Sequence, residues 1–268
     1  MQPTLNNGTT KDVSFPTPIK HPSGAVLEGI PLLFLLTLTA ALLIPRLRAE
    51  EGKRWTVDAT LYGLAAGLSG DVTIKGFDAP LDVGFDQIWD NLELGAMGKV
   101  RVGYDRWALT TDVIYMGLQA SQGPLTAALD QWVVEPSLSY RVCKGFELLA
   151  GARYYNLSGE LRGPGLLPAP RMLAGTQDWW DPIVGANVTL PLGRRFSFNL
   201  RGDVGGFGAG SDLTWQAFPW FGWHISKSFS LQAGYRWVYT DYETGSGPSR
   251  FRYDVLTQGP QVGFALSF

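Results

Sequence analysis

Residues 99–115, KVRVGYDRWALTTDVIY, contain the pattern that decides the fold of this chain. Polar and apolar side chains alternate up to Tyr104 and alternate again after Trp107, and only Asp105 and Arg106 separate the two runs. Successive side chains of a β-strand point to opposite faces, so a period of two indicates strands. The stretch therefore predicts a hairpin whose tight polar turn lies between two aromatic residues.

The same arrangement recurs three more times along the chain. Polar turns at 141–145, 193–195 and 224–228 each have an aromatic residue on at least one side. The chain then stops on an alternation of small or polar and apolar residues over 262–268. Short turns that join many alternating strands are typical of one end of a transmembrane β-barrel.

Ten segments carry the two-residue period, and the sequence offers no long amphipathic helix to cover their apolar faces. They are residues 55–62, 94–104, 107–118, 132–141, 146–157, 180–190, 196–207, 213–226, 229–242 and 251–268. Runs of roughly ten residues are long enough to cross the hydrocarbon core when tilted. We predict an all-β, transmembrane, antiparallel up-and-down β-barrel of about ten strands, with eight or twelve strands as the alternatives.

The connections opposite the short turns are longer, as is usual on the outer side of such a barrel. They span residues 119–131, 162–178 and 243–250, with a shorter one near 208–212. The longest is 69–91, in which the apolar residues at 85, 88, 89 and 92 have helical spacing. We predict a short helix in this first outer loop, capping the barrel or folded into its mouth; alternatively, residues 78–84 extend a strand.

Three prolines, Pro136, Pro219 and Pro260, fall inside predicted strands. Proline has no N–H to donate to a neighbouring strand, so we expect a bulge or a local break at each. The assignment of faces after Pro260 is therefore open by one residue.

Composition agrees with a membrane barrel and excludes several other classes. Aromatic residues make up 13% of the 268 residues, with 10 Trp, and they gather near both predicted ends of the strands. This indicates two aromatic girdles at the membrane interfaces. A formal net charge of −2 provides no basic field for nucleic acid. A single cysteine, Cys143, excludes an intrachain disulfide framework and zinc-finger spacing.

The N-terminal residues 1–49 are predicted to be a disordered extension followed by a signal peptide. The apolar run 30–44 has the length of a signal-peptide core and is short for a transmembrane helix. Cleavage before Glu50 would leave residues 50–268 as the barrel. The alternatives are a single membrane anchor, and a true translation start nearer residue 27.

Several segments resemble small outer-membrane β-barrel proteins of Gram-negative bacteria, a group without an assigned activity. They are the first strand at 55–62, DQIWDNLELGAMGKVRVGYDRW (86–107), DVGGFGAGSDLTWQAF (203–218) and GPQVGFALSF (259–268). The resemblance covers about residues 54–268 and implies a bacterial outer-membrane protein. The first and last strands of its barrel would both have their chain ends on the periplasmic side. Phe264, Leu266 and Phe268 are similar to the assembly signal of such proteins. The implied partners are outer-membrane lipids, lipopolysaccharide and the barrel-assembly machinery; the oligomeric state stays open.

Charged residues of both signs fall on the predicted lumen faces. They are Asp58, Lys99, Arg101, Asp112, Glu135, Arg141, Glu147, Arg153, Arg201, Asp203 and Arg236. Their near-balance favours pairing, because unpaired charge in a narrow lumen is costly. We predict a lumen largely filled by an ion-pair network, since ten strands lie near the side-chain-filled end of the size range. A selective conduction path is the alternative.

No catalytic, metal-binding or cofactor-binding residues are assigned, and no cofactor is expected. His224 and Ser226 share a strand face, as in some lipid-hydrolysing barrels, but they adjoin a turn on the expected periplasmic side. Outer-rim carboxylates could serve a protease, bind calcium or simply be solvated; they are Asp178, Asp181, Asp212 and Asp241. Three classes stay open: a structural or passive small-solute protein, which we favour, a lipid- or peptide-hydrolysing enzyme, and a surface receptor or adhesin.

Overall fold

A computed structural model describes residues 55–74, 77–90, 92–122, 125–162 and 173–268, and strands account for most of them. The strands are β1 (Trp55–Leu64), β2 (Gly67–Ile74), β3 (Phe77–Val83), β4 (Leu92–Tyr104), β5 (Trp107–Gln122), β6 (Leu125–Cys143), β7 (Phe146–Arg162), β8 (Leu173–Leu192), β9 (Phe196–Gly206), β10 (Leu213–His224), β11 (Phe229–Thr244) and β12 (Phe251–Ser267). Two short helices complete the description, α3 (Phe85–Asp90) and the 3-10 turn η1 (Gly247–Ser249). The extension and signal peptide predicted for residues 1–49 lie outside the described residues.

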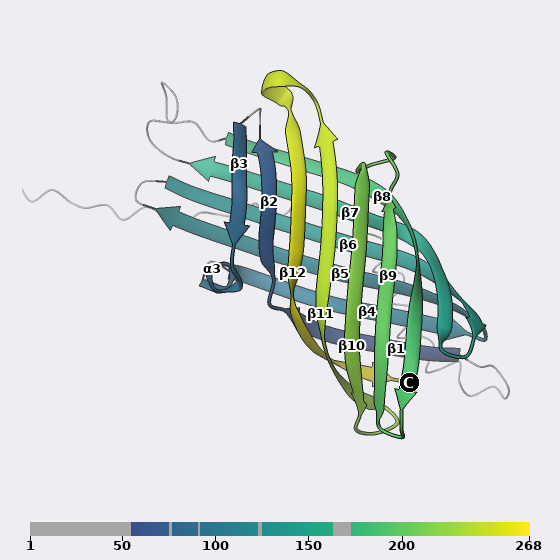
Figure 1. The fold of residues 1–268 in the computed structure, drawn as a ribbon. Helices are drawn as coiled ribbons and strands as arrows, with labels where there is room; N and C mark the ends of the chain where they lie inside the picture. Colours follow the sequence, from purple (N-terminus) through teal and green to yellow (C-terminus); the bar gives the residue numbers. More distant parts are fainter. Residues whose placement is uncertain (1–54, 75–76, 91, 123–124, 163–172) are drawn as a thin grey trace, which may run out of the picture. The chain divides into compact units, whose positions relative to one another are not determined.

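Ten of the strands close into an antiparallel barrel (Figure 1). Each strand from β4 to β12 pairs with the next, and β1 closes the circle by pairing with both β4 and β12. The predicted fold class and strand number are confirmed. The four predicted tight turns join β4 to β5, β6 to β7, β8 to β9 and β10 to β11. We call the barrel end that carries these turns the short-turn end, and the opposite end the outer end.

The strand β12 has two different partners on the same side. Its segment 261–267 pairs with β1, whereas Phe251 to Gln258 pair with β2, and β3 then pairs with β2. The predicted helix is present as α3. The strand β3 corresponds to the alternative of a strand at 78–84, whereas the loop expected at 69–74 was wrong, because those residues belong to β2. Once β1 has ended, the outer half of β12 needs another backbone partner, and the hairpin of β2 and β3 supplies it.

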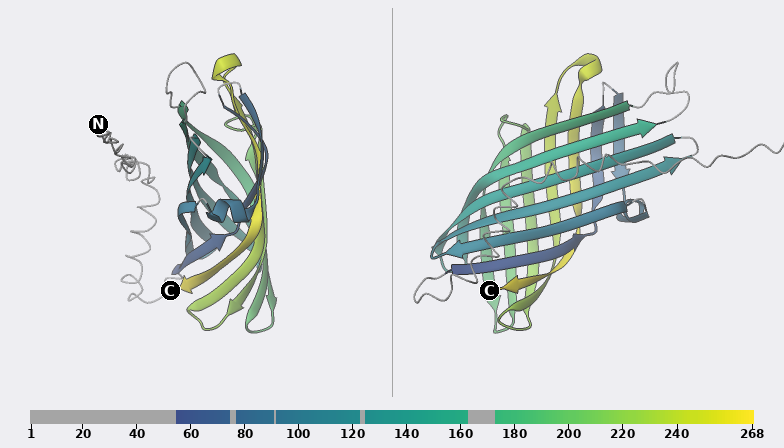
Figure 2. Two further views of the ribbon diagram at one scale, coloured as in Figure 1. Left: turned by 90° about the vertical axis from the view of Figure 1, so that its left-hand side faces the viewer. Right: turned by 180° about the vertical axis from the view of Figure 1, so that it is seen from behind.

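The described backbone pairing leaves an interruption in the outer half of the wall. The strand β3 pairs only with β2, and residues 92–97 of β4 pair only with β5. The helix α3 connects these two strand edges and lies at the outer end of β4 (Figure 2). Among the described residues, no helix is long and apolar enough to cross a membrane.

The outer ends of several strands extend further than the sequence pattern predicted. The loop expected at 119–131 was wrong, because β5 and β6 stay paired out to Gln122 and Leu125. The strand β8 begins at Leu173 rather than at 180, while residues 163–172 lie outside the described part. Strand pairing uses the backbone, so it can continue beyond the lipid where apolar alternation is no longer required.

The three prolines coincide with local breaks in the backbone pairing. Pairing of β6 with β7 stops at Val134 and resumes at Ser137 in the same register, so Pro136 causes a gap rather than a bulge. Pairing of β10 with β11 skips Pro219 in the same way. At Pro260 the neighbouring strand itself changes from β2 to β1. In each case the proline, which has no N–H, lies at an interruption in the pairing with one neighbouring strand, while the pairing on its other side continues.

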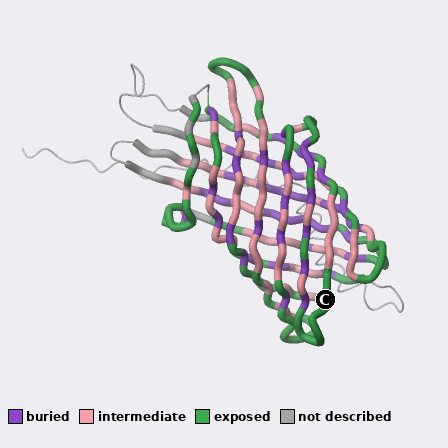
Figure 3. Tube along the Cα trace, viewed as in Figure 1, coloured by how far each residue is buried: buried purple, intermediate pink, exposed green. Residues whose placement is uncertain are grey.

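Burial alternates along the strands, as expected when one face points inward (Figure 3). In β9 the inward residues Ser197, Asn199, Arg201 and Asp203 are buried, while Leu200 and Val204, which point the other way, are exposed. Aromatic rings of neighbouring strands contact one another near both ends of the outer surface. Examples are Trp55–Tyr104 and Trp107–Tyr140 at the short-turn end, and Tyr115–Trp132 and Tyr154–Trp180 toward the other end.

Candidate functional site in the barrel lumen

The centre of the lumen is occupied by four charged side chains that satisfy one another. Arg153 on β7 lies 2.7 Å from Glu135 on β6 and 2.7 Å from Asp203 on β9. Arg201 pairs with the same two carboxylates, at 3.0 Å from Asp203. Arg153, Glu135 and Asp203 are at most 1% exposed at the side chain, so solvent does not reach them. Two guanidinium groups thus balance two carboxylates.

A second cluster of lumen side chains, from β1, β5, β10 and β11, is hydrogen-bonded to the first. Arg236 on β11 lies 3.2 Å from Asp112 on β5 and donates to the Gln216 carbonyl oxygen at 2.6 Å. The Tyr62 hydroxyl of β1 donates to Asp112 at 2.5 Å. The amide of Gln216 in turn donates to Asp203 at 3.3 Å, which links the two clusters. We call these residues, Tyr62, Asp112, Glu135, Arg153, Arg201, Asp203, Gln216 and Arg236, the lumen network.

The lumen network includes six of the eleven lumen residues named from the sequence, and adds Tyr62 and Gln216. Arg101 and Glu147 lie closer to the short-turn end and pair at 2.8 Å, with Arg141 at 3.5 Å from the same carboxylate. Asp58 accepts a bond from the Ser267 hydroxyl at 2.5 Å instead. Sequence reasoning could have found Tyr62 because it lies on the polar face of its strand.

Lys99 occupies a different position from the other predicted lumen cations. Its ammonium lies 5.4 Å from the centroid of the Trp220 ring, and no carboxylate of the described residues lies within ion-pair distance of it. Asp112 is its direct partner in the β4–β5 register, but the oxygens of Asp112 are engaged by Tyr62 and Arg236. Lys99 is therefore left with a ring contact.

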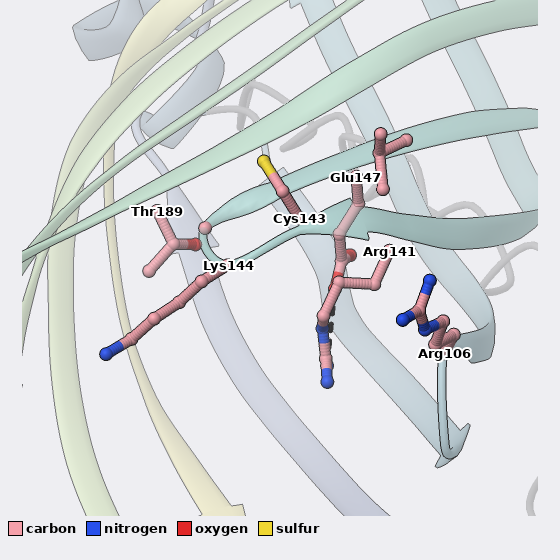
Figure 4. Close-up of a pocket in the computed structure, with 8 residues that line it drawn as sticks. Arg106, Arg141, Cys143, Lys144, Glu147 and Thr189 are labelled. Atoms are coloured by element: carbon pink, nitrogen blue, oxygen red, sulfur yellow. Dashed lines mark hydrogen bonds and ion pairs between the residues drawn. The ribbon is translucent and has the colours of Figure 1, made fainter.

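Two neighbouring hollows lie between the lumen network and the short-turn end. The inner one has a volume of about 220 Å³, and its walls include Lys99, Arg101, Ser137 and Ser139. The other hollow lies nearer the short-turn end, has a volume of about 470 Å³ and is shown in Figure 4. We call it the turn-side concavity. Its lining residues are Arg106, Arg141, Val142, Cys143, Lys144, Gly145, Glu147 and Thr189. Glu147 and Thr189 line both hollows.

On the other side of the lumen network, towards the outer end, the lumen contains a cluster of buried apolar and aromatic side chains. The buried side chains there are Leu68, Ile88, Met116, Val133, Tyr155, Leu157, Trp179, Tyr253 and Val255. The Trp179 ring stacks on Tyr242 at 4.0 Å and on Tyr155 at 4.8 Å. Ile88 of α3 is 5% exposed, so the helix is folded into this cluster. The sequence analysis missed this layer, although adjacent aromatics at 154–155 and 179–180 must place one ring on each strand face.

The other candidates from the sequence are dispersed. The His224 ring lies 3.2 Å from the Ser197 hydroxyl, whereas Ser226 Oγ accepts bonds from backbone N–H groups of its own turn. The carboxylate of Asp181 accepts bonds from the Trp179 ring N–H and the Ser211 backbone N–H. Among the described residues, no three His, Cys, Asp or Glu side chains are grouped to hold a metal ion.

At the outer end, Arg250 lies in the turn before β12. It donates to Glu243 at 2.8 Å, and this bond raises the pKa of Arg250 above its usual value. The residues of the predicted assembly signal lie at the opposite end of β12. Phe264, Leu266 and Phe268 are 39%, 39% and 51% exposed, and they face away from the lumen.

No protein-family model matches the sequence, and no curated protein matches it either. Among solved structures, the outer membrane protease OmpT from Escherichia coli is similar with a TM-score of 0.51 and 8% identity, covering 82% of this chain and 99% of that one. Ail, the attachment invasion locus protein of Yersinia pestis, covers 80% and 98% with a TM-score of 0.38 and 9% identity. The chain has the fold of a Gram-negative outer-membrane β-barrel. The outer-membrane location predicted from the sequence agrees with that fold. Structural similarity at 8% sequence identity does not indicate a shared activity.

Proposed function

We propose that the protein is an integral outer-membrane β-barrel with a structural or passive role, and that its lumen is closed at rest. The observation that carries this proposal is the buried lumen network, whose ion pairs connect β6, β7 and β9 across the interior. A solute that crossed the barrel would have to separate ion pairs that are almost completely buried. Breaking one such pair by removing a partner typically costs about 3–5 kcal/mol.

The apolar outer layer supports the same proposal. Trp179, Tyr155 and Tyr242 stack in the lumen, and Ile88 from α3 packs with them. Hydrated ions cross such a layer only when water replaces the packed side chains. A closed lumen is also what a ten-stranded barrel favours, because barrels of this size have little space beyond their own side chains.

Conductance of the purified barrel in planar lipid bilayers tests the proposal. We expect no stable channel for the wild-type protein. Arg153→Ala removes the side chain that contacts both Glu135 and Asp203, so folded Arg153→Ala should show intermittent openings. The matched control is Arg250→Ala, which removes an ion pair in the outer turn and should leave the membrane silent. Stable wild-type channels would contradict the closed-lumen proposal.

We also propose that the short-turn end faces the periplasm. Cys143, the single cysteine of the sequence, is exposed in the turn-side concavity. A membrane-impermeant maleimide should therefore label it only after the outer membrane has been opened. Labelling in intact cells, at the rate seen in opened cells, would reverse the proposed orientation.

A further inference from the structure

The inner hollow beneath the lumen network has the size and wall chemistry of a small-ligand site. Its volume of about 220 Å³ would hold about seven water molecules at ~30 Å³ each. The hydroxyls of Ser137 and Ser139 and the amide of Asn187 line it, and all three groups can donate hydrogen bonds. Phe218 and Trp220 also line the hollow.

The charge around this hollow is positive once the ion pairs are assigned. Four cations line it, Lys99, Arg101, Arg201 and Arg236, and two carboxylates, Asp112 and Glu147. Glu147 is engaged by Arg101, and Asp112 by Arg236. Arg201 pairs with Glu135 and Asp203, which also balance Arg153. Lys99 is the cation that remains without a carboxylate among the described residues.

Access to the hollow also favours an anion. The turn-side concavity, which shares Glu147 and Thr189 with the hollow, carries Arg106, Arg141 and Lys144. Cations at the mouth of a cleft raise the local concentration of anions and speed their entry. The lumen network closes the other end, so a ligand would enter and leave by the same route. This geometry suits binding rather than passage.

We propose that Lys99 and the inner hollow form a binding site for a small free oxyanion, such as phosphate or sulfate, that enters from the short-turn end. The ammonium of Lys99 supplies the charge, and the donors of Ser137, Ser139 and Asn187 supply the remaining hydrogen bonds. The site goes beyond the proposed structural role; the single route of entry rests on the proposed closed lumen, whereas the binding itself does not. A barrel that conducted ions could still bind the oxyanion here.

Isothermal titration of the purified, folded barrel with inorganic phosphate and with sulfate, at constant ionic strength, tests the proposal. The wild-type protein should bind both ions, and Lys99→Gln should bind at least about tenfold more weakly, which corresponds to ~1.4 kcal/mol. Lys99→Arg should keep most of the affinity, because it keeps the charge. Arg250→Gln removes a cation in the outer turn and should bind like the wild type.

A second measurement needs no change at Lys99. Cys143 lines the turn-side concavity, so a methanethiosulfonate reagent can add either a sulfonate or a quaternary ammonium group there in the folded protein. The sulfonate should weaken phosphate binding relative to the ammonium group. Short-chain phosphatidic acid distinguishes the source of the phosphate group. Binding of this lipid without binding of free phosphate, equal affinity of Lys99→Gln and wild type, or no effect of the Cys143 charge would each overturn the proposal.

Discussion

Removing Arg153 should destabilise the barrel more than removing any exposed charge. The Arg153 side chain is 1% exposed and contacts Glu135 and Asp203, each at 2.7 Å. In Arg153→Met, Arg201 alone would face both carboxylates, and one buried negative charge would lose its partner. Loss of one partner from a buried ion pair costs about 3–5 kcal/mol, so the free energy of unfolding should fall by that amount.

The double variant Arg153→Met with Glu135→Leu separates this charge effect from lost packing. It removes one charge of each sign and leaves Arg201 paired with Asp203 at 3.0 Å. Apolar replacement of a buried ion pair is often neutral or stabilising, so the double variant should be at least ~2 kcal/mol more stable than Arg153→Met alone. Urea unfolding in lipid vesicles, followed by heat-modifiable electrophoretic mobility, measures both values.

Arg250→Met provides the surface control for the same assay. Arg250 and Glu243 form an exposed pair, with side chains 35% and 41% exposed, and such pairs contribute about 0–1 kcal/mol. The reasoning fails if Arg153→Met costs no more than Arg250→Met, or if the double variant is less stable than the single one.

Three further predictions concern other parts of the barrel. Ile88→Asp should release α3 from the apolar layer and make it accessible to protease. Trp89→Ala is the control, because Trp89 is 64% exposed, and it should not increase cleavage. Equal cleavage of the two variants would refute the packing role of Ile88. Gly234→Ala should lower the urea midpoint, because its added Cβ would clash with the Pro219 carbonyl oxygen. Gly159→Ala meets no atom within 4 Å and should change stability by less than about 0.5 kcal/mol; matching midpoints would count against the steric argument. Phe268→Ser should reduce the amount of heat-modifiable barrel in membranes, because it removes an apolar residue of the predicted assembly signal, and an unchanged amount would argue against that role.

The period of two was enough to predict the barrel, because lipid outside and a polar lumen impose opposite demands on alternate residues. The same period predicted the strand bounds poorly where a strand no longer has lipid on one face and a polar lumen on the other. Beyond residue 118, β5 and β6 continue as a paired hairpin, and polar and apolar residues no longer alternate clearly in the sequence there. The hairpin of β2 and β3 was missed for a related reason. These strands are short, they contain Gly70 and Pro80, and β2 pairs with β12, for which the predicted barrel already supplied a neighbour.

The sequence placed charged residues on the lumen face but could not assign their partners. Arg201 and Glu135 belong to β9 and β6, which are not neighbours in the sheet, so only the curvature of the closed barrel brings them together. The same limit explains why Lys99 could not be singled out. Register pairs Lys99 with Asp112, and Asp112 is instead engaged by Tyr62 of β1 and Arg236 of β11, which are far from it in the sequence.

The apolar outer layer is explained by the interruption in the wall beside β3 and β4. The described backbone pairing does not join these two strands, so hydrogen bonds between strands cannot hold this side of the barrel closed. Side-chain packing takes over that role. Leu68 of β2 and Ile88 of α3 belong to the same cluster as Met116 of β5 and Val133 of β6. A polar lumen at this level would supply no such attraction, and water entering through the interruption would compete for its hydrogen bonds. The change from a charged centre to an apolar outer half therefore follows from where β1 ends and the continuous ladder with β4 stops.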